Sequence, residues 1–223
     1  MHFEFLTEDP SSGKAMEILL PKLLANNDTY NIHSYKGTGH IPKGLKPKSD
    51  ANKRILLDQL PRLLRGYGKV PYSGYIIIIC DLDDRKKKQF LSELNEVLNA
   101  CNPKPNARFC LAIEEFEAWY LGDLTAIRKA YPRAKRSILE SYISDSICGT
   151  WELLADAVCK GGHRALVKNG WQAVGKQKSI WAEEISPYMN VDDNISPSFK
   201  NMLKQLQRIG AEAAPDHLSQ VAR

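Results

Sequence analysis

The chain has 223 residues, of which 43% are apolar and 26% are charged, and its net charge is +5. This composition supplies enough apolar side chains for a packed core, which excludes a disordered or fibrous protein. No apolar run approaches the ~18–20 residues that a membrane-spanning helix requires, and the first residues lack the pattern of a secretory signal. We therefore expect a cytoplasmic protein.

The first part of the chain predicts strands and helices in alternation. The expected strands are residues 3–7, 30–35, 74–80 and 108–113, and the expected helices are residues 15–24, 50–64, 86–100 and 115–122. The run Tyr75–Cys80 contains four consecutive isoleucines, which is typical of a strand covered on both faces of a parallel sheet. The alternation predicts an α/β fold with a doubly wound, mainly parallel, four-stranded sheet.

The rest of the chain predicts helices without further strands. These helices are expected at residues 124–131, 138–142, 151–159, 179–189 and 198–213. The last one is the best defined, because its apolar residues recur at helical spacing from Phe199 to Ile209. We therefore divide the chain into an α/β domain, residues 1–125, and a helical C-terminal part, residues 126–223, that packs on it.

Carboxylates follow three of the four predicted strands. Glu8 follows the first strand, Asp81 and Asp83 follow the third, and Glu117 follows the fourth. Parallel strands end at the same edge of a sheet, where ligands bind, so these side chains are expected to converge. Grouped carboxylates repel one another unless a cation neutralises them, and their oxygens suit Mg²⁺ or Mn²⁺. In extended geometry Asp81 and Asp83 would reach one ion, while Leu82 would turn into the protein.

Most of these acidic residues also have a structural alternative. The aspartates after the third strand would suit the N-cap of the following helix, and Asp84 suits that position best. Glu8 would fit an ordinary turn, and Glu114 and Glu115 would fit solvated charges in the first turn of a helix. Glu117 lies in an apolar stretch, which disfavours a simple surface role for it.

A glutamate after the first strand and a DxD motif after the third, in a small parallel α/β domain, resemble the Toprim fold. Toprim domains occur in topoisomerases, bacterial primases, a ribosomal RNA maturase and the overcoming-lysogenization-defect nucleases. More closely, four patterns resemble a Toprim-like family of uncharacterised bacterial proteins, often encoded beside ATPases in defence loci. They are FLTEDPSS, IIIICDLDDR, IEEFEAWYLGD and WAEEISPYMNVDDNISPSF. The first pattern departs from the commonest Toprim motif, because Asp9-Pro10 stands where a glycine usually follows the glutamate.

The resemblance implies a Mg²⁺- or Mn²⁺-dependent nuclease, or a related phosphoryl-transfer enzyme, that acts on DNA or RNA. By matching position, it implies that the metal ligands are Glu8, Asp81, Asp83, Glu117 and Asp123. The first four of these would be catalytic, with Glu8 as the general base. The resemblance also implies a role in phage defence and a partner ATPase encoded nearby.

Positive charge is concentrated in one segment of the chain. Residues 36–69 contain nine lysines and arginines against two aspartates, so this segment is basic and the remainder is slightly acidic. The loop within it follows the second predicted strand and is expected at the same sheet edge as the carboxylates. Cations beside a metal site suit a bridging phosphate backbone, and a solvated loop is the alternative. The nucleic-acid-binding candidates are Lys36, His40, Lys43, Lys46 and Lys48.

The C-terminal part adds aromatic and basic residues. Trp151, Trp171 and Trp181 are expected to pack in the helical layer, with base stacking as the alternative. The lysines that would extend the phosphate-binding track are Lys176, Lys178 and Lys200.

Three other functions account for parts of the pattern. A haloacid-dehalogenase-like hydrolase also uses a DxD motif, but there the motif usually follows the first strand, and Asp83-Asp84-Arg85 departs from its usual sequence. A non-catalytic partner that regulates an ATPase would retain the acidic edge as a structural or sensing metal site. A plain nucleic-acid-binding module would explain the basic loop but not the converging carboxylates.

Overall fold

Four strands form a single sheet in the computed structural model, which describes residues 1–42, 54–70 and 74–213. The strands are β1 (His2–Thr7), β2 (Thr29–Ser34), β3 (Tyr75–Asp81) and β4 (Ala107–Ala112). All of them pair in parallel, in the order β2-β1-β3-β4. The prediction of an α/β fold with a parallel four-stranded sheet is therefore confirmed.

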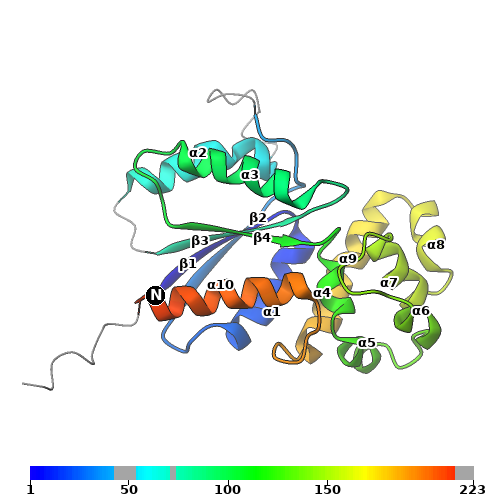
Figure 1. The fold of residues 1–223 in the computed structure, drawn as a ribbon. Helices are drawn as coiled ribbons and strands as arrows, with labels where there is room; N and C mark the ends of the chain where they lie inside the picture. The colour runs from blue at the N-terminus through cyan, green and yellow to red at the C-terminus, as the bar shows by residue number, and fades with distance from the viewer. Residues whose placement is uncertain (43–53, 71–73, 214–223) are drawn as a thin grey trace, which may run out of the picture.

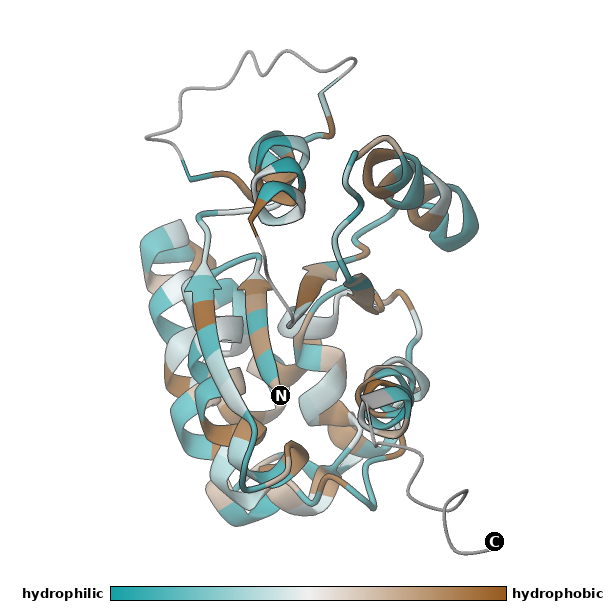
Figure 2. Ribbon diagram, turned by 90° about the vertical axis from the view of Figure 1, so that its left-hand side faces the viewer, coloured by the Kyte–Doolittle hydropathy of each residue, from teal (hydrophilic) through white to brown (hydrophobic). Residues whose placement is uncertain are grey.

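Helices cover both faces of the sheet (Figure 1). Helices α2 (Leu56–Lys69) and α3 (Lys87–Asn99) lie on one face, and α1 (Pro10–Leu23) and α10 (Pro197–Ala213) lie on the other. The helices carry hydrophobic and hydrophilic residues on different sides (Figure 2), as expected for elements that cover a sheet.

The isoleucines of β3 explain why this strand has no polar alternation. Ile76 and Ile78 pack into the apolar core beneath α2 and α3, whereas Ile77 and Ile79 pack into the core beneath α1 and α10. All four are at most 1% exposed. Each face of the strand is therefore apolar because each face is buried, which is what the sequence predicted.

The remaining helices gather beyond the carboxyl end of the sheet (Figure 1). They are α4 (Glu117–Leu121), α5 (Leu124–Ala130), α6 (Arg136–Glu140), α7 (Thr150–Val158), α8 (Gly162–Lys168), α9 (Trp171–Ile185) and the short 3-10 helix η2 (Ser186–Tyr188). The sequence patterns missed α8 and began α9 at residue 179. Glycines interrupt the apolar periodicity there, and Gly161 and Gly170 adopt φ values of 82° and 91° just before the two helices.

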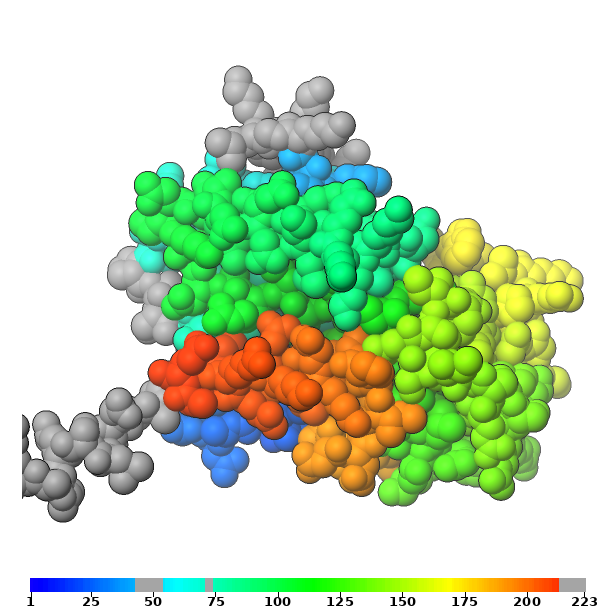
Figure 3. All heavy atoms as spheres, in the orientation of Figure 1, coloured from blue at the N-terminus to red at the C-terminus, as the bar shows by residue number. Residues whose placement is uncertain are grey.

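Two of the late helices return to the α/β part. Helix α9 packs against α1, and α10 packs against β4. In Figure 3, α10 (orange to red) runs along the surface beside the green residues of α3 and β4. One apolar core contains residues of β1, α1, α7, α9 and α10 together, so the division at residue 125 stays a prediction. None of the helices in the described residues is long and apolar enough to cross a membrane.

A buried polar network holds the first turn of α10. The indole Nε1 of Trp119 donates to the hydroxyl of Ser198 at 3.0 Å. The carboxylate of Asp145 accepts from the backbone N–H of Ser198 at 2.6 Å and from the hydroxyl of Ser196 at 2.8 Å. Because Trp119 is fully buried, its N–H depends on this network for a partner.

We predict that Ser198→Ala lowers the free energy of unfolding by about 2 kcal/mol, because the buried indole N–H loses its acceptor. Urea denaturation followed by circular dichroism measures the change. The exposed Ser92→Ala is the matched control, and its effect should stay within about 0.5 kcal/mol. Equal effects of the two substitutions would contradict the role given to this network.

Candidate active site

Glu8 and Asp81 lie together at the carboxyl ends of the two central strands. The backbone N–H of Asp81 donates to Glu8 Oε2 at 2.9 Å, and the hydroxyl of Thr38 donates to Glu8 Oε1. Asp81 is the last residue of β3 and is only 8% exposed. The parallel pairing of β1 with β3 therefore brings these two acidic residues into one partly closed site.

Burial raises the pKa of both carboxyl groups. The pKa of Asp81 lies well above its ordinary value of 3.8, because burial removes the carboxylate from water and the charge of Glu8 repels it. Burial also raises the pKa of Glu8, although the hydrogen bonds from Thr38 and from the Asp81 N–H lower it. Carboxylates in this position favour a nearby cation or a bound proton.

Lys178 brings a positive charge from α9 into this acidic group. Its Nζ lies 3.2 Å from Glu117 Oε2 and 3.3 Å from Glu115 Oε2. Burial alone would lower the pKa of Lys178, but the charges of Glu117, Glu115, Asp81 and Asp9 raise it above 10.5. Lys178 therefore stays charged and acts as an internal cation among the carboxylates.

The site also contains Asp9, Glu115 and Lys178. Sequence patterns indicated no role for Asp9, and they predicted a solvated charge for Glu115 and a phosphate contact for Lys178. Asp9 caps α1 by accepting from the backbone N–H of Ser12 at 2.7 Å, and its charge raises the pKa of Asp81. Glu115, expected as a solvated charge, is mostly buried, and burial raises its pKa to about 7. The only sequence signal for Asp9 was its position next to Glu8. The pairing of Lys178 with Glu117 had no such signal, because the two residues are 61 positions apart in the chain.

Glu117 is the most deeply buried acidic residue of the site. It is the first residue of α4 and is 2% exposed. Burial raises its pKa, and the charge of Lys178 partly offsets that effect. The structure thus places Glu117 near Asp81 and beside Lys178.

Asp83 does not continue the direction of β3. The strand ends at Asp81, Leu82 turns into the core as expected, and Asp83 has a left-handed backbone with a φ of 51°. Its carboxylate pairs with Arg85 at 2.7 Å and is 42% exposed. The expected extended geometry is therefore wrong beyond Leu82, although the charge of Asp83 still raises the pKa of Glu8. The role expected for Asp84 is also wrong, because α3 begins at Lys87 without a side-chain cap.

Asp123 uses both carboxylate oxygens to hold backbone groups. Its Oδ1 accepts from the N–H of Ala126 at 2.9 Å, and its Oδ2 accepts from the N–H of Asn190 at 2.8 Å. The residue therefore caps α5 and fixes the segment that follows η2. Because these bonds already occupy both of its oxygens, Asp123 serves a structural role here and does not join Glu8 and Asp81.

Glu114 anchors the helical part to the sheet. Its carboxylate accepts from the backbone N–H groups of Cys148 at 3.1 Å, Gly149 at 2.9 Å and Thr150 at 2.8 Å. Burial alone would raise the pKa of Glu114, but these bonds and one from the Thr150 hydroxyl lower it. Glu114 is therefore not the solvated charge expected from the sequence, because it binds the first turn of α7.

Part of the basic loop lies at this edge. The backbone N–H of Gly37 donates to the carbonyl oxygen of Glu8 at 2.9 Å, and Thr38 contacts the Glu8 side chain. Lys36 and His40 flank these residues and are exposed. The other expected nucleic-acid-binding residues, Lys43, Lys46 and Lys48, lie outside the described residues.

The carboxylates suit a divalent ion by their chemistry but do not form a finished site. Among the described residues, no group of three or more histidine, cysteine, aspartate or glutamate side chains is arranged to hold a metal ion. Oxygen donors of this kind are those that Mg²⁺ and Mn²⁺ prefer. Binding would therefore require the ammonium of Lys178 to move, or Glu8 to exchange its present hydrogen bonds.

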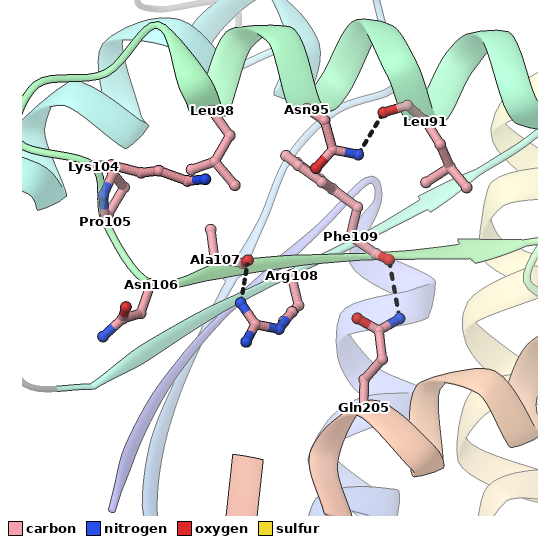
Figure 4. Close-up of a pocket in the computed structure, with 10 residues that line it drawn as sticks. All are labelled: Leu91, Asn95, Leu98, Lys104, Pro105, Asn106, Ala107, Arg108, Phe109 and Gln205. Atoms are coloured by element: carbon pink, nitrogen blue, oxygen red, sulfur yellow. Dashed lines mark hydrogen bonds between the residues drawn. The ribbon is translucent and has the colours of Figure 1, made fainter. Parts of the chain in front are cut away.

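A cavity of about 440 Å³ lies elsewhere, along the open edge of β4 between α3 and α10 (Figure 4). No acidic side chain lines it. At its wall, Gln205 Nε2 donates to the carbonyl oxygen of Phe109 at 3.2 Å. Since this cavity begins at Asn106 and Ala107, at the amino end of β4, it is separate from the carboxylates at the other end of the sheet.

Comparison with known families gives one match, over residues 7–207. The chain belongs to the DUF4276 family. The family is described as a domain of unknown function, and its match includes Glu8, Asp81, Glu117 and Lys178. No curated protein and no solved structure matches the chain. The candidate active site therefore lies within the DUF4276 domain, and the family description assigns it no activity.

We predict that Glu114→Gln lowers the free energy of unfolding by about 2 kcal/mol at pH 7, because charge-assisted hydrogen bonds to α7 are lost. The pKa of Glu114 is lowered in the folded state, so its stabilisation is full above the ordinary value of 4.5 and is lost as the pH falls through the lowered value. Denaturation at pH 7 and at pH 3 should show the difference shrinking in acid. The exposed Glu17→Gln serves as control, and a pH-independent difference would contradict the prediction.

We predict that Lys178→Met destabilises the protein by about 3 kcal/mol, because Glu115 and Glu117 lose a buried countercharge. Chemical denaturation of the metal-free protein measures this loss. Lys176→Met removes an exposed lysine from the same helix and should change stability by less than about 0.5 kcal/mol. If the two variants were equally stable, Lys178 would not be the internal cation of the site.

Proposed function

We propose that this DUF4276 protein is a Toprim-like, Mg²⁺- or Mn²⁺-dependent hydrolase of nucleic-acid phosphodiester bonds. The observation that carries the proposal is the convergence of Glu8, Asp81 and Glu117 at one edge of a parallel sheet. Glu8 follows β1, Asp81 ends β3 and Glu117 begins the helix after β4, and burial raises the pKa of all three. Three buried carboxylates that are poorly hydrated are stabilised by a doubly charged cation.

In this proposal, different residues bind the metal ion, act as the general base and contact the phosphate. Asp81 and Glu117 would hold the ion, which would supply a Lewis acid that stabilises charge on the phosphate. Glu8 accepts from the backbone N–H of Asp81, so it would lie next to a metal ligand, and we assign it the general-base role implied by the Toprim resemblance. The ammonium of Lys178 would be released toward a phosphate oxygen of the substrate.

Lys36 and His40 provide the first contacts for the nucleic-acid backbone in this proposal. Both are exposed and lie on the loop that is hydrogen-bonded to Glu8 through Gly37 and Thr38. A cation at this position would bind a phosphate next to the scissile one. Phage defence and a partner ATPase are further parts of the proposal that rest on the Toprim resemblance, and a cytoplasmic location is a separate part of it.

One observation favours a second function. Lys178 already neutralises part of the acidic group, so the site is compensated without a metal. A non-catalytic protein that regulates an ATPase would need only this compensated site, or a metal that it binds and senses. The two functions differ in whether metal binding is followed by cleavage.

We predict metal-dependent cleavage of plasmid DNA or of RNA by the purified protein, lost on chelation of the metal. Asp81→Asn and Glu8→Gln should each reduce the rate by at least about 100-fold, because the first removes a ligand and the second a base. Asp84→Asn is the control, since this exposed carboxylate belongs to the same DxDD sequence. Cleavage that survives in Asp81→Asn would come from a contaminant and would contradict the proposal.

A thermal-shift measurement separates binding from catalysis. Mn²⁺ at about 100 times its dissociation constant should stabilise the wild-type protein by about 2.7 kcal/mol, or about 5–10 °C in melting temperature. Asp81→Asn should abolish this shift, and Asp84→Asn should keep it. A shift without cleavage would support the regulatory function. The absence of both a shift and cleavage would contradict the proposed metal site.

A further inference from the structure

The segment that leads into Lys178 is strongly basic. Residues 157–182 contain five lysines and arginines and not one aspartate or glutamate. This segment forms the end of α7, α8 and the first part of α9. Lys178 points into the acidic site, and the other four cations are exposed on the surface. These exposed cations are Lys160, Arg164, Lys168 and Lys176.

An exposed tryptophan lies between these cations in the sequence. Trp171 is the first residue of α9 and is 72% exposed, so the expectation that it packs in the helical layer is wrong. The tryptophans at 119, 151 and 181 are at most 5% exposed. The ring of Trp171 meets that of Trp151 edge to face, with centroids 6.3 Å apart. The indole is therefore supported on one side, while most of its surface faces solvent.

Trp171 and the acidic site are connected by helix geometry. Trp171 and Lys178 are seven residues apart on α9, so they lie on the same side of the helix. The rise along the axis between them is about 10 Å. Their partners also adjoin, because Trp171 contacts α7, Lys178 contacts α4, and α4 packs against α7.

We propose that α8 and the start of α9 bind single-stranded nucleic acid. This α8–α9 surface consists of Lys160, Arg164, Lys168 and Trp171, and it projects at one end of the molecule (yellow in Figure 3). An unpaired base stacks on Trp171, and the neighbouring phosphates contact the exposed cations. A base inside a duplex is already stacked, so the surface selects unpaired strands.

This inference rests on the proposed function and names its substrate class. A strand whose base stacks on Trp171 and that runs along α9 would come to the level of Lys178 after about 10 Å of rise along the helix axis. That distance is roughly two to three nucleotides of backbone, at about 3.4 Å per stacked base or more when extended. The surface would therefore hold the strand while the bond to be cut lies at the sheet edge.

Fluorescence anisotropy of a labelled 12-nucleotide strand, in EDTA, tests the surface without any cleavage. Trp171→Ala should weaken binding of single-stranded DNA or RNA by about 5- to 150-fold. Trp171→Phe should keep most of the affinity, because it keeps an aromatic face. Tyr188→Ala removes an aromatic residue that is 50% exposed outside the α8–α9 surface, and it should bind like the wild type.

Two further arms make the experiment specific. Lys168→Ala should reduce the slope of log affinity against log salt by about 0.7, as expected for one lost phosphate contact on a single strand. A blunt duplex of the same sequence should bind without dependence on Trp171. Because Trp171 is largely exposed, Trp171→Ala should melt within about 2 °C of the wild type.

The inference is overturned if the wild type does not bind single strands, or if Trp171→Ala binds them equally well. It is also overturned if poly-glutamate displaces the strand and shows the same dependence on Trp171, since the surface would then be a site for acidic polypeptides. Trp171-dependent binding without cleavage would support the surface while the proposed hydrolase fails. Cleavage with Trp171-independent binding would support the hydrolase and refute the surface.

Discussion

The ion pairs of Lys178 with Glu115 and Glu117 are the interaction on which the arrangement of this protein depends. A parallel sheet brings the ends of its strands to one edge, and here carboxylates follow those ends. Burying these charges without a countercharge would destabilise the folded protein. Helix α9 supplies the compensating charge from a distant part of the chain, and it packs on α1 in doing so. The helical part is thus held to the sheet by charge as well as by a shared apolar core.

Local patterns in the sequence predict the sheet well, because the features that specify it are local. Ile76–Ile79 can be covered only by apolar layers on both sides, and the strand that they form orients Asp81. The site is less predictable, because Lys178 pairs with Glu117 across 61 residues and no local pattern encodes that contact. The left-handed backbone of Asp83 and the exposed ring of Trp171 also depend on loops and helix starts that periodicity does not describe.

The structure shows one state of the acidic edge, and the proposed function implies a second. In the state described by the structure, Lys178 neutralises part of the group and Glu8 is held by Thr38 and by the N–H of Asp81. In the metal-bound state that we propose, a divalent ion would replace the ammonium as the countercharge, and the side chain of Lys178 would be free to contact a phosphate. A single lysine would thereby couple occupancy of the metal site to the affinity for substrate.

Gln205 contacts the outer edge of the sheet, where another chain could add a strand. Strand β4 lies at the end of the sheet order, and the amide of Gln205, carried by α10, occupies the outward carbonyl oxygen of Phe109. An uncovered strand edge is a template on which other chains add strands. Helix α10 therefore covers part of this edge, and we expect a variant without α10 to expose more of the strand and to aggregate more readily.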